Sequence, residues 1–194
     1  MALAYGHRGS ESLAGVGWGV SGLSVISRCL KTWAQDGAPD GVLLSTTDRV
    51  CLDGNQLRLV SGTYGVAGST YRTEVDTVAR ITAIGSAGNG PASFTIEQPN
   101  GLVYEYGGTA DSRIESLATG LTTTARTWAL NKIRDREGNA ITFTYQEDGA
   151  PNGDFRILYV DYSSNSGQGL SAIYRVAFTY ATQPSTDVDS EYFA

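Results

Sequence analysis

The sequence contains few of the residues on which catalytic and metal sites depend. Among its 194 residues there is one histidine, His7, and there are two cysteines, Cys29 and Cys51. A nucleophilic triad would have to use His7, and Ser21 has Leu23 where a nucleophile elbow requires glycine. Two cysteines and one histidine do not complete a four-ligand zinc site, and their spacing fits no zinc module. We therefore expect no metal and no cofactor, and we expect His7 to be an exposed residue of a loop or strand.

Basic clusters, long apolar runs and a complete nucleotide-binding loop are also missing. There are 14 basic and 20 acidic residues, so the net charge is −6, and no segment is richly basic. Nucleic acids and anionic membranes bind clustered positive charge, which argues against both as partners. No apolar run approaches about 20 residues, the length of a membrane-spanning helix. The glycine-rich segment 15–22 has Val20 where G-x-G-x-x-G needs its last glycine, so we expect no nucleotide site.

The N-terminal residues indicate a piece of a longer protein. They lack the basic leader and the apolar centre of a signal peptide, and Met1 is the only methionine. The length suits a single domain that buries a core. We expect residues 1–180 to form one β domain excised from a longer protein, and residues 181–194 to form a polar tail.

Glycine, tyrosine and threonine are abundant, and their arrangement predicts strands and tight turns. The chain has 24 glycines and 11 tyrosines, with only 18% charged residues. Runs with apolar residues at every second position flank turn-forming residues. The expected hairpins are 48–60 around Asp53-Gly54, 94–106 around Pro99-Asn100-Gly101, 128–145 around 135–139, and 155–180 around 163–169. Because Ile141–Tyr145 and Val176–Tyr180 resemble copies of each other, we expect an all-β fold in which antiparallel hairpins stack into one continuous sheet.

Helix is expected only in the region 111–121, and at most as one short element. Ser112 and Glu115 have the spacing of a capping box, and Gly120 is a plausible C-terminal stop. The alternative is a loop that crosses the sheet. The segment from Gln35 to Gly41 is expected to be a polar loop.

The sequence allows two states of Cys29 and Cys51, a disulfide or two reduced thiols. Both residues lie in strand-like segments on either side of a loop, and they are 22 positions apart. A disulfide would stabilise the fold by roughly 3 kcal/mol through loop closure. The alternative is two buried thiols. We favour the disulfide, because small secreted strand-rich domains use such bridges.

The acidic and the aromatic residues each suggest an alternative function. A glycosidase-like hydrolase needs two carboxylates, and the weak candidates are Glu74 with Asp76 and Glu97 with Glu105. A carbohydrate-binding or adhesion module would use exposed aromatic rings. Tryptophans could supply such a platform: Trp18, Trp33 and Trp128. We expect the alternating tyrosines and phenylalanines to be core instead: Tyr104, Tyr106, Phe143, Tyr145, Phe178 and Tyr180.

Several long motifs resemble one family. They are Gly15–Trp18, Ser21–Cys29, Ala34–Gly37, Asp48–Gly54, Tyr71–Asp76, Gly85–Pro91 and Trp128–Asn131, and Asp135–Tyr145 looks like a YD-type repeat. They resemble the N-terminal, SpvB-like region of bacterial toxin-complex B subunits and related Rhs (YD-repeat) proteins. The resemblance runs from about Leu3 to Tyr180.

The resemblance implies a structural role and no catalytic residues. In such proteins this region is β-sheet that contributes to a hollow shell around a toxic domain. It therefore implies a non-catalytic shell segment that helps to encapsulate or deliver a toxin domain, secreted or at the bacterial cell surface. The implied partners are other Rhs/YD repeats and toxin-complex subunits. Cutting a sheet out of its shell exposes strand edges, so we also expect self-association by edge pairing.

Overall fold

The computed structural model describes residues 2–5, 18–75, 77–147 and 153–181, and its fold is all-β as predicted. The strands are β1 (Ala2–Tyr5), β2 (Trp18–Ser21), β3 (Val25–Cys29), β4 (Arg49–Leu52), β5 (Asn55–Ser61), β6 (Thr70–Thr73), β7 (Arg80–Ile84), β8 (Ser93–Glu97), β9 (Val103–Tyr106), β10 (Arg113–Glu115), β11 (Ala125–Arg134), β12 (Asn139–Glu147), β13 (Phe155–Asn165) and β14 (Tyr174–Ala177). The helical elements are α1 (Trp33–Asp36) and the 3-10 turns η1 (Ala110–Ser112) and η2 (Ser166–Gln168). Three predicted features, His7, Asp76 and the tail from residue 182, lie outside the described residues.

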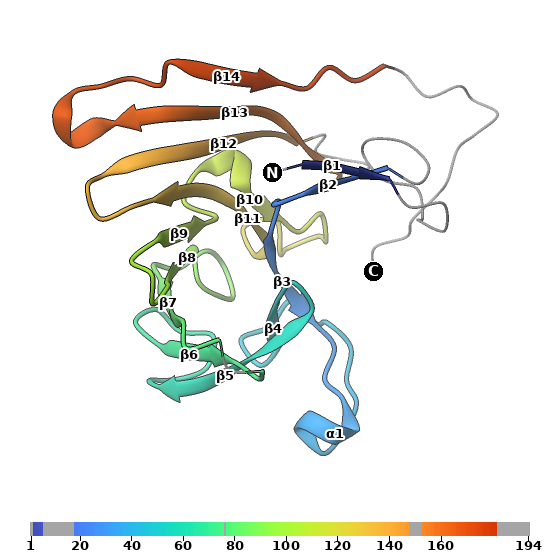
Figure 1. The fold of residues 1–194 in the computed structure, drawn as a ribbon. Coiled ribbons are helices and arrows are strands. Elements are labelled where there is room, and N and C mark those ends of the chain that lie inside the picture. The colour runs from blue at the N-terminus through green and yellow to red at the C-terminus, as the bar shows by residue number, and fades with distance from the viewer. Residues whose placement is uncertain (1, 6–17, 76, 148–152, 182–194) are drawn as a thin grey trace.

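One antiparallel sheet holds all the described strands except β1 and β2, which pair with each other. The strands from β3 to β9 pair with one another in chain order, and the connection between β3 and β4 carries α1. β11 then pairs with β3 and with β9, which closes these strands into a ring (Figure 1). The predicted continuous sheet is thus confirmed.

β11 joins the ring to an open part of the sheet. Its first half pairs with β3, where Trp128 lies opposite Ile26, and its second half pairs with β9, where Ile133 lies opposite Tyr104. Beyond the ring, β12 pairs with β11, β13 with β12 and β14 with β13. These three strands, β12 to β14, are called the extension below, and Figure 1 shows them stacked outward from the ring.

Turn chemistry places the hairpins where the sequence predicts them. β4 and β5, β8 and β9, β11 and β12, and β13 and β14 are antiparallel pairs. In the first turn Asp53 has a φ of 46° and Gly54 a φ of 80°. Two consecutive left-handed residues give the type of two-residue turn whose twist matches the strands, and Asp-Gly is one of its preferred sequences. All four predicted hairpins are therefore confirmed.

The short helix forms at a different place from the one predicted. α1 lies at residues 33–36, partly within the predicted polar loop, and it is the one α-helix in the described part of the chain. The hydroxyl of Thr32 accepts a hydrogen bond from the backbone N–H of Gln35, and Gly37, with a φ of 76°, ends the helix. A hydroxyl cap before the turn and a left-handed glycine after it are the ordinary helix signals, and they outweigh the polar composition of the loop.

The region 111–121 contains the 3-10 turn η1 and the strand β10 in place of the expected helix. The reciprocal capping pair is Thr109 with Ser112, one turn earlier than the predicted pair of Ser112 with Glu115. Ile114 is buried and lies opposite Thr127 of β11. The helical location was wrong because an edge of β11 was free to pair with this segment.

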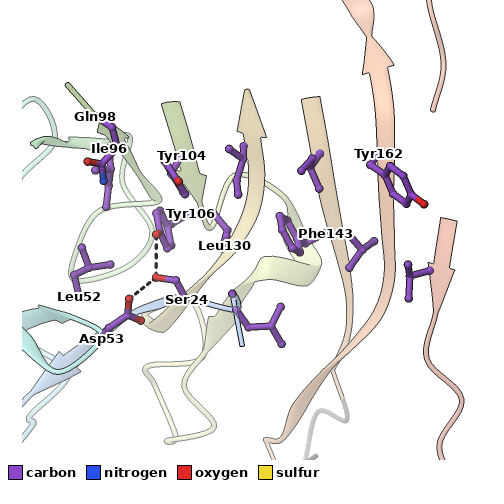
Figure 2. A pocket seen from close by; sticks show the side chains of 16 residues that line it. Ser24, Leu52, Asp53, Ile96, Gln98, Tyr104, Tyr106, Leu130, Phe143 and Tyr162 are labelled. Carbon is purple, nitrogen blue, oxygen red and sulfur yellow. Dashed lines mark hydrogen bonds between the residues drawn. The ribbon is translucent and has the colours of Figure 1, made fainter. Parts of the chain in front are cut away.

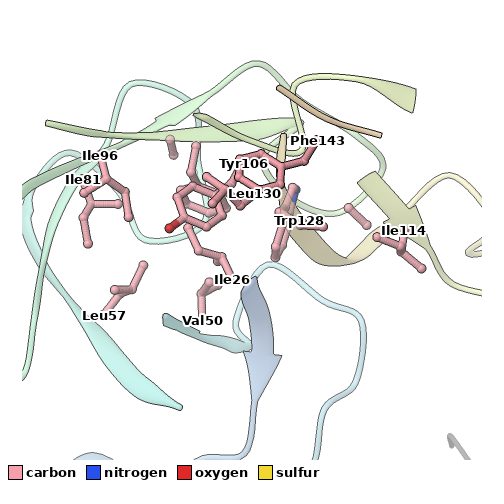
Figure 3. Packing of buried hydrophobic residues seen from close by; sticks show 14 of the residues in the cluster. Ile26, Val50, Leu57, Ile81, Ile96, Tyr106, Ile114, Trp128, Leu130 and Phe143 are labelled. Atoms are coloured by element: carbon pink, nitrogen blue, oxygen red, sulfur yellow. The ribbon is translucent and has the colours of Figure 1, made fainter. Parts of the chain in front are cut away.

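The interior of the ring is a tightly packed apolar core. Figure 3 shows Trp128, Ile26, Leu57 and Ile81 pointing into it from different strands. Trp128 is fully buried, its indole N–H donates to the carbonyl of Pro91, and its ring meets Phe94 edge to face, with 5.0 Å between ring centroids. Edge-to-face contact is a preferred geometry for aromatic pairs, so this cluster fixes the closed part of the sheet.

Candidate functional site

An apolar groove of about 790 Å³ lies on the face of the sheet where the ring meets the extension (Figure 2). It is lined by Gly22, Leu23, Ser24, Leu52, Asp53, Ile96, Gln98, Tyr104, Tyr106, Leu130, Ile133, Ile141, Phe143, Val160, Tyr162 and Val176. Asp53 is the one charged residue among them. A groove of this size with few polar groups has the composition of a binding surface for apolar groups.

A cross-strand row of side chains builds the floor of the groove. Ile81 lies opposite Ile96, Ile96 opposite Tyr104, Tyr104 opposite Ile133, and Ile133 opposite Ile141. Directly opposed residues project from the same face of a sheet. The exposed fraction is 0% at Ile81 and 37% at Ile141. The apolar inner face of the ring therefore continues onto the extension, where no described element covers it.

A second row runs along the extension itself. Phe143 lies opposite Val160, and Val160 lies opposite Val176. Beside them the rings of Tyr162 and Tyr174 stack, with 5.2 Å between centroids. Phe143 is buried, whereas the outer side chains are substantially exposed. The open face of the extension thus carries a contiguous apolar and aromatic surface.

A small polar network closes one end of the groove. The hydroxyl of Ser24 donates to Asp53 at 2.6 Å and lies 3.0 Å from the hydroxyl of Tyr106 (Figure 2). The other carboxylate oxygen of Asp53 accepts the backbone N–H of Val25 at 2.9 Å. Burial raises the pKa of Tyr106, so its hydroxyl stays neutral at ordinary pH. These groups satisfy one another and hold the β4–β5 turn against the ring.

The predicted candidate carboxylates lie away from this groove, each beside an arginine. Glu97 comes directly after the groove-lining Ile96, and Glu105 lies between the groove-lining Tyr104 and Tyr106. Because successive residues of a strand point to opposite faces, both glutamates project away from the groove. Glu97 pairs with Arg80 and Glu105 with Arg134. The structure therefore does not gather these residues into the groove.

Glu74 is also held by a basic partner. Its carboxylate accepts hydrogen bonds from Arg58 and Gln35, and these bonds lower its pKa. A general acid needs a raised pKa, which makes Glu74 a poor candidate for that role. Its expected partner Asp76 lies outside the described residues.

One carboxyl that the sequence analysis missed has the opposite tendency. Partial burial, together with the nearby Glu115 and Asp111, raises the pKa of Glu147. Glu147 and Glu115 both line a small cavity of about 160 Å³. No sequence motif marks this pair, because β10 and β12 come close only in the folded chain.

The tryptophans do not form a shared platform. Trp128 is 0% exposed, whereas Trp33, on α1, is 71% exposed. The side chain of Trp18 lies outside what the structure describes. The hypothesis of a sugar platform built from these tryptophans is therefore wrong for Trp128, whose ring is core.

Cys29 and Cys51 form a disulfide in the structure. Their Cα atoms are 5.9 Å apart on the neighbouring strands β3 and β4. The bridge closes the segment that carries α1, at the point where this segment leaves the sheet. It thus ties the base of the projecting α1 segment seen in Figure 1.

A buried arginine, also missed, connects four parts of the chain. Arg28 donates to Asp48 at 3.0 Å, to the carbonyl of Ser45 at 2.6 Å, to that of Asn89 at 2.9 Å and to that of Ala125 at 2.8 Å. The side chains of Arg28 and Asp48 are 3% and 1% exposed. A buried charge needs such partners. The signal was present, because Arg28, Asp48 and Asn89 all lie in motifs that carry the family resemblance.

Other classes of site find no support in the described ranges. No three histidine, cysteine, aspartate or glutamate side chains there lie close enough together to hold a metal ion. None of the helices described is long and apolar enough to cross a membrane.

The sequence matches a family model over almost its full length. The model of SpvB, described as Salmonella virulence plasmid 65kDa B protein, matches residues 1–187. A search of curated proteins found no match.

Solved structures with the same fold come from bacterial toxins. The N-terminal domain of effector protein SpvB from Salmonella typhimurium strain LT2 has a TM-score of 0.63 and 18% identity, covering 93% of this chain and 62% of that one. The TcdB2-TccC3-Cdc42 crystal structure has a TM-score of 0.61 and 17% identity, covering 82% of this chain and 8% of that one. The Photorhabdus luminescens Tc holotoxin pore has a TM-score of 0.60 and 16% identity, covering 95% and 9%.

The chain thus spans less than two thirds of each of these structures' chains. At these identities the similarity establishes the fold.

Proposed function

The chain belongs to the SpvB family, and on that premise we propose that it is a structural β-sheet segment of a bacterial toxin-complex protein. Its role is to help encapsulate or deliver a toxin domain, and it has no catalysis of its own. The domain of residues 1–180 is one segment of a longer shell-forming protein that is secreted or displayed at the cell surface.

The open apolar face of the extension is the observation that carries this proposal. Ile141 is 37% exposed, although it continues a row that is buried at Ile81 and Ile96, and Tyr162 and Val176 on the same face are 38% and 39% exposed. A soluble surface seldom leaves apolar side chains contiguous unless something docks on them. We propose that a neighbouring segment of the assembly covers this face.

The similar structures support a choice of partner by analogy. One of them, the TcdB2-TccC3-Cdc42 crystal structure, contains TcdB2 and TccC3 together. By analogy, this chain contacts a TccC3-like subunit or further Rhs/YD repeats of its own protein. The surface supports such a partner because it is large, apolar and nearly free of charge, with Asp53 at one end.

Substrate turnover distinguishes the structural role from a hydrolase. The purified chain is incubated with chromogenic ester, phosphate and glycoside substrates. We expect no turnover, and we expect His7→Ala to behave as the wild type. Reproducible turnover that Glu74→Gln, Glu97→Gln or Glu105→Gln abolishes without unfolding the chain would contradict the proposal.

A hydrolase remains the second candidate, and Glu147 is the observation that favours it. A carboxyl with a raised pKa beside another carboxyl, Glu115, has the composition of an acid–base pair. If the substrate panel shows activity, Glu147→Gln is the first variant to test, with Glu137→Gln, in the turn at the opposite end of β12, as an exposed control.

A further inference from the structure

Among the described strands, β14 forms an edge of the sheet. It pairs with β13 on one side, no described strand pairs with its other side, and all four of its residues are exposed. Edge strands are usually protected by proline, lysine or a bulge. β14 has no proline or lysine, and its one charge, Arg175, is held by Asp161 through two hydrogen bonds of 2.6 and 2.8 Å. The edge is therefore available for pairing.

The backbone register shows which groups point outward. Val176 lies opposite Val160, and the N–H of Phe178 donates to the carbonyl of Leu158 at 2.9 Å. In an antiparallel pair, hydrogen-bonded and non-hydrogen-bonded positions alternate. Val176 and Phe178 therefore turn their backbone groups toward β13. Arg175 and Ala177 turn theirs toward the open edge.

We propose that two copies of this chain pair antiparallel through β14 about a two-fold axis at Val176. Arg175 then forms its outward hydrogen bonds with Ala177 of the second copy, and Val176 lies opposite its own counterpart. On the groove face, Tyr174 lies opposite Phe178 of the second copy. The two open apolar faces then join into one surface.

Side-chain chemistry selects this register over its neighbour. Shifting the axis to Arg175 would place two arginines directly opposite each other, which is destabilising. In the proposed register Arg175 faces alanine, and every pair on the groove face is apolar or aromatic. A two-fold contact requires such self-complementarity of one surface patch. Because the strands are short, the buried area is below about 1,200 Å² and the dimer is weak and concentration-dependent.

A cysteine scan along β14 tests the register. The two native cysteines are bonded to each other, so an introduced cysteine supplies the free thiol. Residues opposite each other at a non-hydrogen-bonded position have Cα atoms about 4.5 Å apart, within disulfide range. We expect Val176→Cys to form a covalent dimer under mild oxidation. Arg175→Cys is the matched control, because its two copies are diagonal and about 7–8 Å apart. Equal cross-linking of both variants, or none at Val176→Cys, would overturn the proposal.

Sedimentation equilibrium of the wild type and of variants without an introduced cysteine tests the edge itself. Ala177→Pro removes an outward N–H without breaking a bond to β13, whereas Ala177→Thr keeps it. We expect the wild type and Ala177→Thr to show a dimer that grows with concentration, and Ala177→Pro to weaken the association at least tenfold. A wild-type chain that stays monomeric at millimolar concentration, or an Ala177→Pro chain that associates as well as the wild type, would contradict it.

Discussion

At the scale of single residues, the buried Arg28–Asp48 pair is the most sensitive point of the fold. It connects β3, the β4 approach, the 86–90 loop and β11 with hydrogen bonds that the sheet does not supply. Removing one partner leaves a buried charge uncompensated, which costs about 3–5 kcal/mol. We expect Asp48→Asn to lower the free energy of unfolding by that amount in urea titration.

The matched control for that prediction is an exposed pair. Arg58 and Glu74 lie 2.8 Å apart, and both side chains are 40% exposed. Solvent screens such pairs, so Glu74→Gln is expected to change the unfolding free energy far less than Asp48→Asn does. Equal effects of the two substitutions would show that Arg28 does not organise the loops.

Phe143 tests whether the lining of the groove is part of the core. Its side chain is 6% exposed, and it packs in the same cluster as Trp128 and Leu130. Phe143→Ala is expected to cost about 3–5 kcal/mol, measured by denaturant unfolding. Phe178→Ala and Ile141→Ala should each lower the free energy of unfolding by less, because Phe178 is only partly buried against the cluster and Ile141 is 37% exposed. A loss at Ile141→Ala as large as that at Phe143→Ala would mean that the face is covered in the isolated chain.

Acid stability depends on carboxylates whose pKa is lowered in the folded chain. Burial alone would raise the pKa of Asp36, but hydrogen bonds from Arg49, Gln56 and the N–H of Thr32 hold it below 3.8. For Asp161 the hydrogen bonds from Arg175 do the same. A group whose folded pKa is lowered stabilises the fold above its unfolded pKa, and this stability is lost as the pH falls through the folded value.

These two groups are therefore expected to make the unfolding free energy fall from about pH 4 downward. Urea titrations at a series of pH values measure this directly. Asp36→Asn should make the unfolding free energy fall less steeply at acidic pH. A chain whose stability rises on acidification would contradict the assignment of these groups.

At the scale of elements, local chemistry explains what the sequence could predict. The hairpins depend on turn residues such as Asp53-Gly54 that lie between alternating runs, so a short window contains the whole signal. The closure of the ring could not be predicted in this way. β11 pairs with β3 and β9, which are distant in the sequence, and no local pattern in β11 indicates these partners. β10 shows the same limit, because a free edge of β11 turned an expected helix into a strand.

The disulfide links two elements, because it joins β3 to β4 across the segment of residues 30–50. Replacing both Cys29 and Cys51 with serine is expected to lower the free energy of unfolding by roughly 3 kcal/mol through a freer unfolded chain. Thiol titration of the unfolded, non-reduced protein should find no free cysteine. Two reactive thiols in that assay would show that the bridge does not form.

At the scale of the whole molecule, the groove is a product of topology. The alternation in β12 and β14 predicts apolar faces, yet it does not reveal which faces stay uncovered. That follows only when the inner face of the ring is seen to continue past β11 onto the extension. The candidate carboxylates were chosen as acids on strands, and in the fold each of Glu74, Glu97 and Glu105 meets an arginine.

The central claim is that a neighbouring segment of a toxin-complex assembly covers the open face of the extension, and a co-purification assay with tagged TccC3 tests it most directly. Ile141→Lys places a charge on the open face, whereas Thr142→Lys, one residue along β12, places the same charge on the opposite face. Circular dichroism first establishes that both variants fold like the wild type.

The account predicts that the wild-type chain and Thr142→Lys are retained by TccC3 and that Ile141→Lys is lost. Failure of the wild-type chain to bind, or retention of Ile141→Lys as strong as that of Thr142→Lys, would contradict it.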